Sequence, residues 1–571
     1  MEIKELYELW KKETASDAML SKDLTGLSDE EIFDRFYREL EFGTAGLRGV
    51  LGAGTNRMNI WTVARVSGGV AHYILEAAKG RECSFAIAYD SRHNSELFAK
   101  TAAAVYAAAG IKVWLYPELM PTPALSYAVR NLHCDGGVVV TASHNPAKYN
   151  GYKVYGADGC QITEAAVAGI LQKIEQTPYF ETIPDFDALL KKGNIEYIGE
   201  NITGKYISDA VSCAKSENDI PRNLKLVYSP LNGTGLKCVT RALAECGFRD
   251  VTIVPEQEKP DGDFPTCPYP NPEIKEALEL GIRLMQKTGA DLLLATDPDC
   301  DRVGTAVPVG DSYRLISGNE MGVLLLDYIC RRKISTGTMP KAPMAVKTIV
   351  TTDMVYEVAK KYGVRVVDVL TGFKYIGEQI AILVEKGEPE NYLLGFEESY
   401  GYLCSQFVRD KDGVSSSVLI CEMANYYKSE GKTLADRMEE LYAEFGTYLN
   451  FVESFSFEGS HGMEKMTEIM TSLRENPPME ILGRKLVSVN DYQLSIKRSL
   501  ENNETEPIRL PKSNVLKFVF EGSLGIIVRP SGTEPKLKIY YTIKADSKDE
   551  ANALAVRLAG KNGTFAALAI R

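Results

Sequence analysis

Three carboxylates alternate along the segment Asp297-Pro298-Asp299-Cys300-Asp301-Arg302. The run before it, Leu292-Leu293-Leu294-Ala295, is apolar and predicts a buried strand, so the acids occupy the loop at its carboxyl end. In extended backbone, side chains at every second position point the same way, and Asp297, Asp299 and Asp301 can converge. Converging carboxylates repel one another unless a cation lies between them, and oxygen ligands suit Mg²⁺. The spacing predicts a metal site with Cys300 directed away from it; a solvated acidic turn is the alternative.

A short apolar strand that runs into a polar loop occurs three more times. These strands end at Val140, Phe396 and Val528, and they lead into residues 141–146, 397–399 and 529–535. In α/β sheets, ligands bind at the carboxyl ends of strands, so four such loops indicate four domains that share a cleft. The spacing predicts an N-terminal helical arm over residues 1–40 and domains over residues 41–205, 206–317, 318–445 and 446–571.

Composition restricts the class of protein. The 571 residues carry a net charge of -12, which argues against nucleic acid or an anionic membrane as partner. No apolar run approaches the ~20 residues that span a bilayer, and the chain does not start with a signal peptide. The eleven cysteines form no C-x-x-C pair, which favours reduced thiols and a cytoplasmic location. Alternating strands and helices after the arm predict α/β layers, and Ser28 predicts a capped helix at residues 28–31.

Ser143 lies in the first of these polar loops. A serine hydroxyl becomes a useful nucleophile only when a base or a cation assists it. His144 is adjacent, but neighbouring side chains rarely hydrogen-bond well enough for a hydrolase triad, and no G-x-S-x-G elbow is present. A serine that only stabilises a turn is the alternative.

The loop after Val528 combines a guanidinium, two hydroxyls and glycine backbone, from Arg529, Ser531, Gly532 and Thr533. Such a loop can bind the oxygens of a phosphate group, with Arg529 bidentate. A hairpin turn with an exposed arginine is the alternative.

Three further segments offer groups for a phosphorylated sugar. Glu397, Glu398 and Ser399 can bind neighbouring sugar hydroxyls, although a solvated acidic turn explains them better when they are taken alone. Adjacent acids cannot straddle a glycosidic bond, which argues against a glycosidase. Arg48 follows a helix on a glycine-rich turn over residues 43–49, and Lys374 follows a predicted strand over residues 364–367.

Together and in this order, these motifs resemble those of the α-D-phosphohexomutase superfamily, of the phosphoglucomutase/phosphomannomutase type. The resemblance extends over nearly the whole chain after the arm. It implies an α/β fold of four domains around a central cleft, the first three with mixed sheets between helices and the last a smaller α+β domain. The Gly-Phe-Glu-Glu-Ser-Tyr-Gly sugar loop, Pro298 and Cys300 are more similar to the longer branch, which includes phosphopentomutases.

The resemblance also implies a role for individual residues. Ser143 would carry the transferred phosphoryl group and complete a metal site with Asp297, Asp299 and Asp301, which would hold one Mg²⁺. Groups around the phosphoryl group would be His144, Arg48, Lys153 and Lys374. Substrate-binding residues would be Arg302, Thr371, Gly372, Glu397, Ser399, Arg529, Ser531, Gly532 and Thr533.

The expected reaction is the interconversion of glucose 1-phosphate and glucose 6-phosphate through phosphorylated Ser143 and a 1,6-bisphosphate, with glucose 1,6-bisphosphate as activator. The expected partner is a small sugar phosphate. Mannose or pentose phosphates remain alternatives, as does a phosphoserine-type sugar phosphatase, which would need no second phosphate site. Lys153, His144 and Lys374 are all possible bases, and the sequence does not choose between them.

Overall fold

The computed structural model describes residues 2–43, 45–214, 220–457, 462–531, 536–560 and 563–569. The chain divides into two compact units. Unit 1 comprises residues 1–318 and 376–433, and unit 2 comprises residues 319–375 and 434–571. Each unit has its own core and is described separately.

The N-terminal arm of unit 1 is helical, as predicted, with α1 (Ile3–Glu13), α2 (Ala18–Asp23) and α3 (Asp29–Phe36). The predicted capping box is confirmed, because Ser28 accepts from the Glu31 N–H and the Glu31 side chain accepts from the Ser28 N–H. Trp10 is fully buried and contacts the ring of Phe180 edge-on, with centroids 5.0 Å apart. The arm is therefore packed against the first domain rather than free of it.

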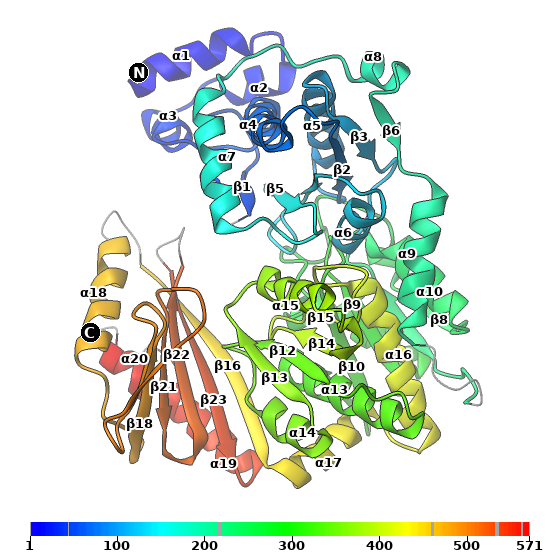
Figure 1. Cartoon of the computed structure of the whole chain (residues 1–571), viewed down its shortest axis with the longest axis vertical. Helices are drawn as coiled ribbons and strands as arrows, with labels where there is room; N and C mark the ends of the chain where they lie inside the picture. The colour runs from blue at the N-terminus through cyan, green and yellow to red at the C-terminus, as the bar shows by residue number, and fades with distance from the viewer. Residues whose placement is uncertain are drawn as a thin grey trace. The chain divides into compact units, whose positions relative to one another are not determined.

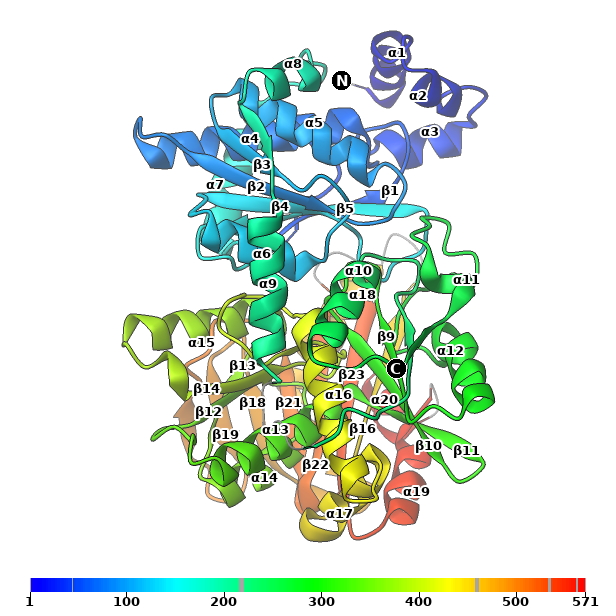
Figure 2. The same ribbon diagram turned by 90° about the vertical axis from the view of Figure 1, so that its right-hand side faces the viewer.

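The first domain is built on a six-stranded mixed sheet with the order β1-β5-β4-β2-β3-β6. Strands β2, β3, β4 and β6 are parallel, while β5 runs antiparallel to both β4 and β1. Helices α4 and α5 cover one face of this sheet and α6 the other (Figure 2). The elements are β1 (Gly46–Val50), α4 (Ile60–Ala78), β2 (Ser84–Tyr89), α5 (Ser95–Ala108), β3 (Lys112–Leu115), α6 (Thr122–Asn131), β4 (Gly136–Val140), β5 (Tyr149–Gly156), α7 (Glu164–Gln176), α8 (Phe186–Lys191), β6 (Ile195–Tyr197) and α9 (Glu200–Ser212).

A second mixed sheet, of five strands, has the order β11-β10-β9-β7-β8. Its central strand β9 is wholly buried, which explains the uninterrupted apolar run that ends where the aspartates begin. The elements are β7 (Leu226–Ser229), α10 (Gly235–Glu245), β8 (Val251–Ile253), α11 (Pro255–Glu258), α12 (Lys275–Thr288), β9 (Leu292–Thr296), β10 (Val303–Val309) and β11 (Ser312–Ile316).

The remainder of unit 1 includes a short antiparallel pair, β14 with β15, followed by the long helix α16. Asp412 caps α16 by accepting from the Val414 and Ser415 N–H groups. The elements are α15 (Phe373–Glu385), whose first turn belongs to unit 2, the 3₁₀ turn η1 (Pro389–Asn391), β14 (Tyr392–Phe396), β15 (Tyr402–Leu403) and α16 (Gly413–Ser429).

Unit 2 contains the parallel pair β12 and β13 and a large antiparallel sheet with the order β16-β23-β22-β21-β18-β19-β20 (Figure 1). Strand β17 pairs with β18. The elements are α13 (Gly318–Ser335), β12 (Met344–Thr348), α14 (Met354–Tyr362), β13 (Arg365–Val369), α17 (Leu434–Phe445), β16 (Thr447–Ser456), α18 (Gly462–Glu475), β17 (Glu480–Ile481), β18 (Arg484–Asp491), β19 (Ile496–Ser499), β20 (Thr505–Pro507), β21 (Leu516–Phe520), η2 (Glu521–Ser523), β22 (Leu524–Pro530), β23 (Lys536–Ala545), α19 (Lys548–Leu558) and α20 (Thr564–Ala569).

Two sequence expectations about the whole chain can be compared with this structure. None of the helices in the described residues has the length and apolar character needed to cross a membrane. All eleven cysteines are free thiols, as the absence of paired cysteine motifs predicted.

Candidate active site

The three aspartates converge as predicted. Asp297, Asp299 and Asp301 are buried, and one carboxylate oxygen of each lies within 4.8 Å of the others. The backbone that brings them together is not extended, because the Cys300 N–H donates to the Asp297 carbonyl at 2.9 Å and Cys300 has φ +51°. The convergence was predicted correctly, but the reason was wrong: a tight turn gathers the acids. Cys300 points away from them, and its sulfur lies against Gly413.

Ser143 reaches this cluster from the loop after β4. Its Oγ donates a hydrogen bond of 2.8 Å to Asp297 Oδ2, and His144 Nδ1 lies 3.2 Å from the same Oγ. Adjacent side chains rarely bond well enough for a hydrolase triad, yet these two lie within hydrogen-bond distance, and Ser143 adopts a left-handed φ of +52°. The serine hydroxyl is thus in contact with a carboxylate and an imidazole.

Two lysines neutralise the acids. Lys153 Nζ, from β5, lies 2.9 Å from Asp299 Oδ2, and Lys411 Nζ lies 3.1 Å from Asp301 Oδ2. Burial opposes ionisation of Asp299, but Lys153 outweighs it and lowers the pKa of this carboxyl. Burial and the neighbouring Asp299 and Asp301 instead raise the pKa of Asp297 well above its ordinary value. The three carboxylates therefore carry more negative charge than the two lysines neutralise.

The donor set fits a divalent cation. Asp299 Oδ1 and Asp301 Oδ1 are buried, and neither accepts a hydrogen bond from the described residues. A buried carboxylate oxygen without a hydrogen bond is costly, and a metal ion would satisfy it. All three ligands offer hard oxygen atoms, which suits Mg²⁺ better than a thiophilic metal. The three aspartates can therefore hold a metal ion beside Ser143.

Arg302 follows the metal loop directly and lies among several carboxylates. Its guanidinium pairs with Glu273 and lies 4.0 Å from Asp297 Oδ2. Burial opposes a charge here, yet Glu273, then Asp301, Asp297 and Glu397 together raise the pKa of Arg302. Glu397, which is only 8% exposed, thus faces the same cluster as the aspartates.

The positions of the basic groups around Ser143 were predicted only in part. Arg48 lies within strand β1, opposite Gly151 of β5, and not on the predicted glycine-rich turn. Lys153 lies on β5 opposite Gly46, so antiparallel pairing brings Arg48 and Lys153 to neighbouring strands. His144 has a pKa well below its ordinary value because it is buried and because Arg302 and Arg48 are close. The imidazole is therefore neutral near pH 7.

Most of the other predicted substrate residues belong to unit 2, and Ser399 belongs to unit 1. Arg529 lies near the end of β22, where it pairs with Lys538 of the antiparallel strand β23. Ser531 N–H donates to the Lys536 carbonyl at 2.7 Å, while Gly532 and Thr533 fall outside the described residues.

Thr371 and Gly372 precede α15. Lys374 Nζ lies 5.0 Å above the Tyr375 ring. Ser399 is partly buried after Glu397 in unit 1. The roles of these residues remain predictions.

Two contacts of the site were not foreseen. Lys411 bridges Asp301 and Asp410, and Thr122 donates from Oγ1 to Asp299 Oδ2 at 3.0 Å. The charged run Arg409-Asp410-Lys411-Asp412 resembles an exposed loop in sequence, yet all four residues are buried. The run lies directly before helix α16 and after the predicted sugar loop, and this position was the only sign in the sequence that it belongs to the site.

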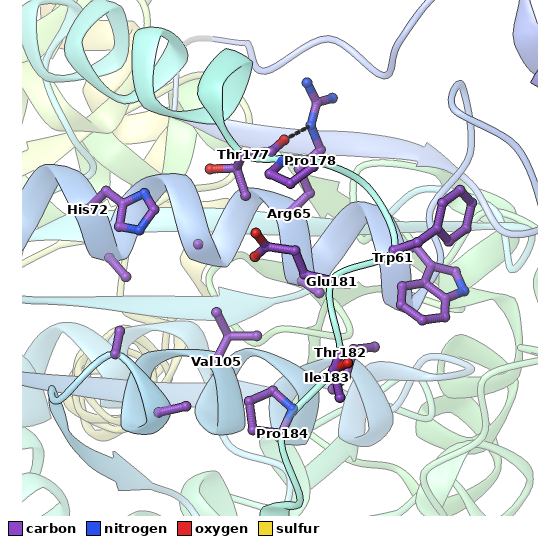
Figure 3. Close-up of a pocket in the computed structure, with 16 residues that line it drawn as sticks. Trp61, Arg65, His72, Val105, Thr177, Pro178, Glu181, Thr182, Ile183 and Pro184 are labelled. Atoms are coloured by element: carbon purple, nitrogen blue, oxygen red, sulfur yellow. Dashed lines mark hydrogen bonds between the residues drawn. The ribbon is translucent and has the colours of Figure 1, made fainter. Parts of the chain in front are cut away.

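Figure 3 shows a separate pocket of about 200 Å³ in the first domain. It lies between α4, α5 and the segment over residues 177–184, with Trp61, Arg65, His72 and Glu181 among its lining residues. It contains none of the predicted site residues.

Four segments of the chain match the phosphoglucomutase/phosphomannomutase family in its own order. They are alpha/beta/alpha domain I over residues 39–180, domain II over 204–310, domain III over 317–445 and the C-terminal domain over 485–561. The chain belongs to this family. The predicted four-domain α/β fold and the resemblance to the superfamily are therefore confirmed, and the chain is an intramolecular phosphotransferase of the phosphohexomutase class.

One curated relative agrees with this assignment, and two solved structures share the fold. The chain is 37% identical over 552 residues to "Phosphoglucomutase" of Staphylococcus aureus strain USA300, covering 95% of this chain and 96% of the relative. A phosphoglucomutase (pp63/parafusin) from Paramecium has a similar fold, with a TM-score of 0.68, 17% identity and coverage of 93% and 96%. An Aspergillus fumigatus N-acetylphosphoglucosamine mutase in complex with GlcNAc-6P and magnesium has a TM-score of 0.50, 15% identity and coverage of 94% and 96%.

Proposed function

We propose that this member of the family interconverts glucose 1-phosphate and glucose 6-phosphate, with Ser143 as the group that is phosphorylated. The observation that carries the proposal is the 2.8 Å hydrogen bond from Ser143 Oγ to Asp297, inside a cluster of three buried carboxylates. This arrangement supports a serine that exchanges a phosphoryl group beside a metal ion. The 37% identity to a phosphoglucomutase supports glucose phosphates over mannose and pentose phosphates, which remain the alternatives.

The chain's own residues have separable tasks in this proposal. The Ser143 hydroxyl hydrogen, which points to Asp297, would turn to neutral His144 Nδ1, 3.2 Å from Oγ, and His144 would take this proton when the serine accepts a phosphoryl group. Lys153 is a poorer base, because its pairing with Asp299, against the effect of burial, raises its pKa and keeps it charged. Lys153 and Arg48 would instead stabilise the negative charge of the transferred group.

Asp297, Asp299 and Asp301 would hold Mg²⁺, which when bound supplies Lewis-acid stabilisation of phosphate charge. Glu397 and Ser399 would bind sugar hydroxyls. Arg529, Ser531, Gly532 and Thr533, with Lys374, Thr371 and Gly372, would bind the phosphate that is not reacting. Glucose 1,6-bisphosphate would activate the enzyme by phosphorylating Ser143. The reducing cytoplasm would be its location, since a reducing environment keeps cysteines as free thiols.

The test is an assay that couples glucose 6-phosphate formation to a dehydrogenase, with glucose 1-phosphate, mannose 1-phosphate and ribose 1-phosphate in competition. Preference for glucose 1-phosphate, with stimulation by glucose 1,6-bisphosphate and Mg²⁺, supports the proposal. A preference for mannose 1-phosphate or ribose 1-phosphate would show that the proposed substrate is wrong. Release of inorganic phosphate without sugar isomerisation would replace the reaction with that of a phosphatase.

A further inference from the structure

Arg92 forms hydrogen bonds with the backbone of the loop that carries Ser143. Its guanidinium donates to four carbonyls: that of Ser143 at 2.6 Å, those of Pro146 and Tyr149 at 3.0 Å each, and that of Asn145. One side chain thereby fixes both ends and the middle of the loop that carries the nucleophile.

This loop needs such support because of its conformation. Ser143 has φ +52°, a left-handed value that residues other than glycine seldom adopt, and it costs about 1 kcal/mol or more. Left-handed backbone persists only where surrounding contacts hold it. The same conformation presents Ser143 Oγ to Asp297 and His144. A change in this φ would therefore move the hydroxyl away from both groups.

Arg92 is itself held rigidly. It is 3% exposed, and its Nε lies 3.4 Å from Asp90 Oδ2 as an ion pair. Asp90 Oδ1 accepts from the Arg92 N–H at 2.9 Å and from Ser95 Oγ at 2.6 Å. On its other side the guanidinium packs on the ring of Phe264, with Cζ 4.9 Å from the ring centroid.

Phe264 comes from the second domain, which also supplies the aspartates. It has φ +47°, and the nearby Gly262 approaches the first domain so closely that a Cβ would meet the His93 nitrogen at 2.7 Å. Arg92 therefore lies where the serine loop of one domain meets a loop of the next. A guanidinium with carbonyl partners is suited to this place, because its planar fork bonds several acceptors at fixed angles, which an ammonium cannot do.

We propose that Arg92 is a positioning residue for phosphoryl transfer: its guanidinium holds Ser143 in the left-handed conformation that directs Oγ at the metal-binding carboxylates. The inference rests on the proposed role of Ser143. It assigns Arg92 no contact with substrate. Arg92 would act entirely through the loop.

The test compares Arg92→Lys with Arg437→Lys as a matched control. Arg437 is also buried, and it pairs with Asp327 in unit 2, outside the predicted site. For each variant, one measures the melting temperature, kcat, KM for glucose 1-phosphate, and the single-turnover rate of Ser143 phosphorylation by glucose 1,6-bisphosphate.

We expect Arg92→Lys to slow Ser143 phosphorylation and kcat about a hundredfold with KM within a few-fold of wild type, since the lysine cannot bond four carbonyls and the nucleophile is misplaced. Arg437→Lys should lower the melting temperature at least as much and leave kcat intact. In Arg92→Gly, added guanidinium at millimolar concentration should restore part of kcat.

Wild-type phosphorylation rates in Arg92→Lys would overturn the inference, as would an equal loss of kcat in Arg437→Lys. If Arg92→Gly does not fold, the lysine variant decides alone. The proposed function fails separately: it fails if the wild-type enzyme itself acquires no phosphate on Ser143.

Discussion

Ser143 Oγ and Asp297 Oδ2 lie 2.8 Å apart, although 154 residues separate them in the chain. The serine follows β4 of the first sheet and the aspartate follows β9 of the second, so both stand at the carboxyl end of a buried strand. Each sheet supplies one half of a site that neither could form alone.

Ser143→Ala should abolish mutase turnover, because no other described hydroxyl donates to Asp297. The measurement is the coupled assay at saturating glucose 1,6-bisphosphate. The exposed Ser429→Ala, on the last turn of α16, is the matched control and should keep wild-type activity. Near-normal turnover in Ser143→Ala would refute the role of this serine.

Asp299→Asn should weaken Mg²⁺ binding more than tenfold, since the variant loses one of three charged oxygen ligands. Isothermal titration with Mg²⁺ measures this directly, without any substrate. Asp263→Asn, which removes an exposed carboxylate from the second domain, should bind Mg²⁺ as wild type does. Equal affinity in the two variants would exclude Asp299 as a ligand.

Lys411→Met should cost about 3 kcal/mol of unfolding free energy, because it leaves the buried Asp301 and Asp410 without their shared cation. Urea denaturation provides the value. Lys428→Met is the control, since Lys428 pairs with Asp291 at a partly exposed site where the expected loss is below about 1 kcal/mol. Similar losses in both variants would contradict the buried role of Lys411.

Arg529→Ala should mainly raise KM, by an amount equivalent to about 2–4 kcal/mol of lost phosphate binding. Steady-state kinetics with glucose 1-phosphate separates KM from kcat. Arg498→Ala, on β19 of the same sheet, is the control. An unchanged KM in Arg529→Ala would mean that Arg529 does not bind the phosphate.

Asp23→Asn should make the stability of the protein less dependent on pH in the acidic range. Burial raises the pKa of Asp23, but hydrogen bonds from Arg35 and from the Ala53 N–H outweigh it, and the net pKa is lowered. A carboxyl with a lowered folded pKa stabilises the protein above its ordinary pKa and loses this contribution as pH falls through the folded value. The free energy of unfolding of the wild type should therefore exceed that of Asp23→Asn by about 1 kcal/mol at pH 6. This value allows for the partial solvent exposure of Asp23.

The same difference should shrink below about pH 4. Thermal unfolding across pH 3 to 7 measures it. A constant difference over this range would show that the charge of Asp23, which pairs with Arg35 and accepts from the Ala53 N–H, does not stabilise the folded arm.

Much of this site is readable from sequence, because strand ends and polar loops follow from local patterns. The Asp297–Asp301 cluster and Ser143 were found in this way. The same pattern was overlooked once: the strand that ends at Tyr89 leads into Asp90-Ser91-Arg92, which supports the serine loop. Asp90 is an acidic neighbour of Arg92, but the four carbonyls that the guanidinium binds leave no mark in the sequence.

Other features depend on tertiary contacts that no local pattern contains. Arg48 was expected on a turn, yet pairing with β5 draws its glycine-rich segment into a strand, where Gly46 accommodates the Tyr152 carbonyl, 1.8 Å from where a Cβ would stand. Lys411 was missed because charged runs are usually solvated. Lys411 is buried where it pairs with Asp301 of another domain as well as with its neighbour Asp410.

The most direct test of the central claim is to follow labelled phosphate. The protein is incubated with glucose 1,6-bisphosphate carrying labelled phosphate, digested and mapped by mass spectrometry, and a second sample is then mixed with unlabelled glucose 1-phosphate. We expect label on the peptide containing Ser143 and its subsequent appearance in glucose phosphates. Label on another residue, or label released only as inorganic phosphate, would contradict it.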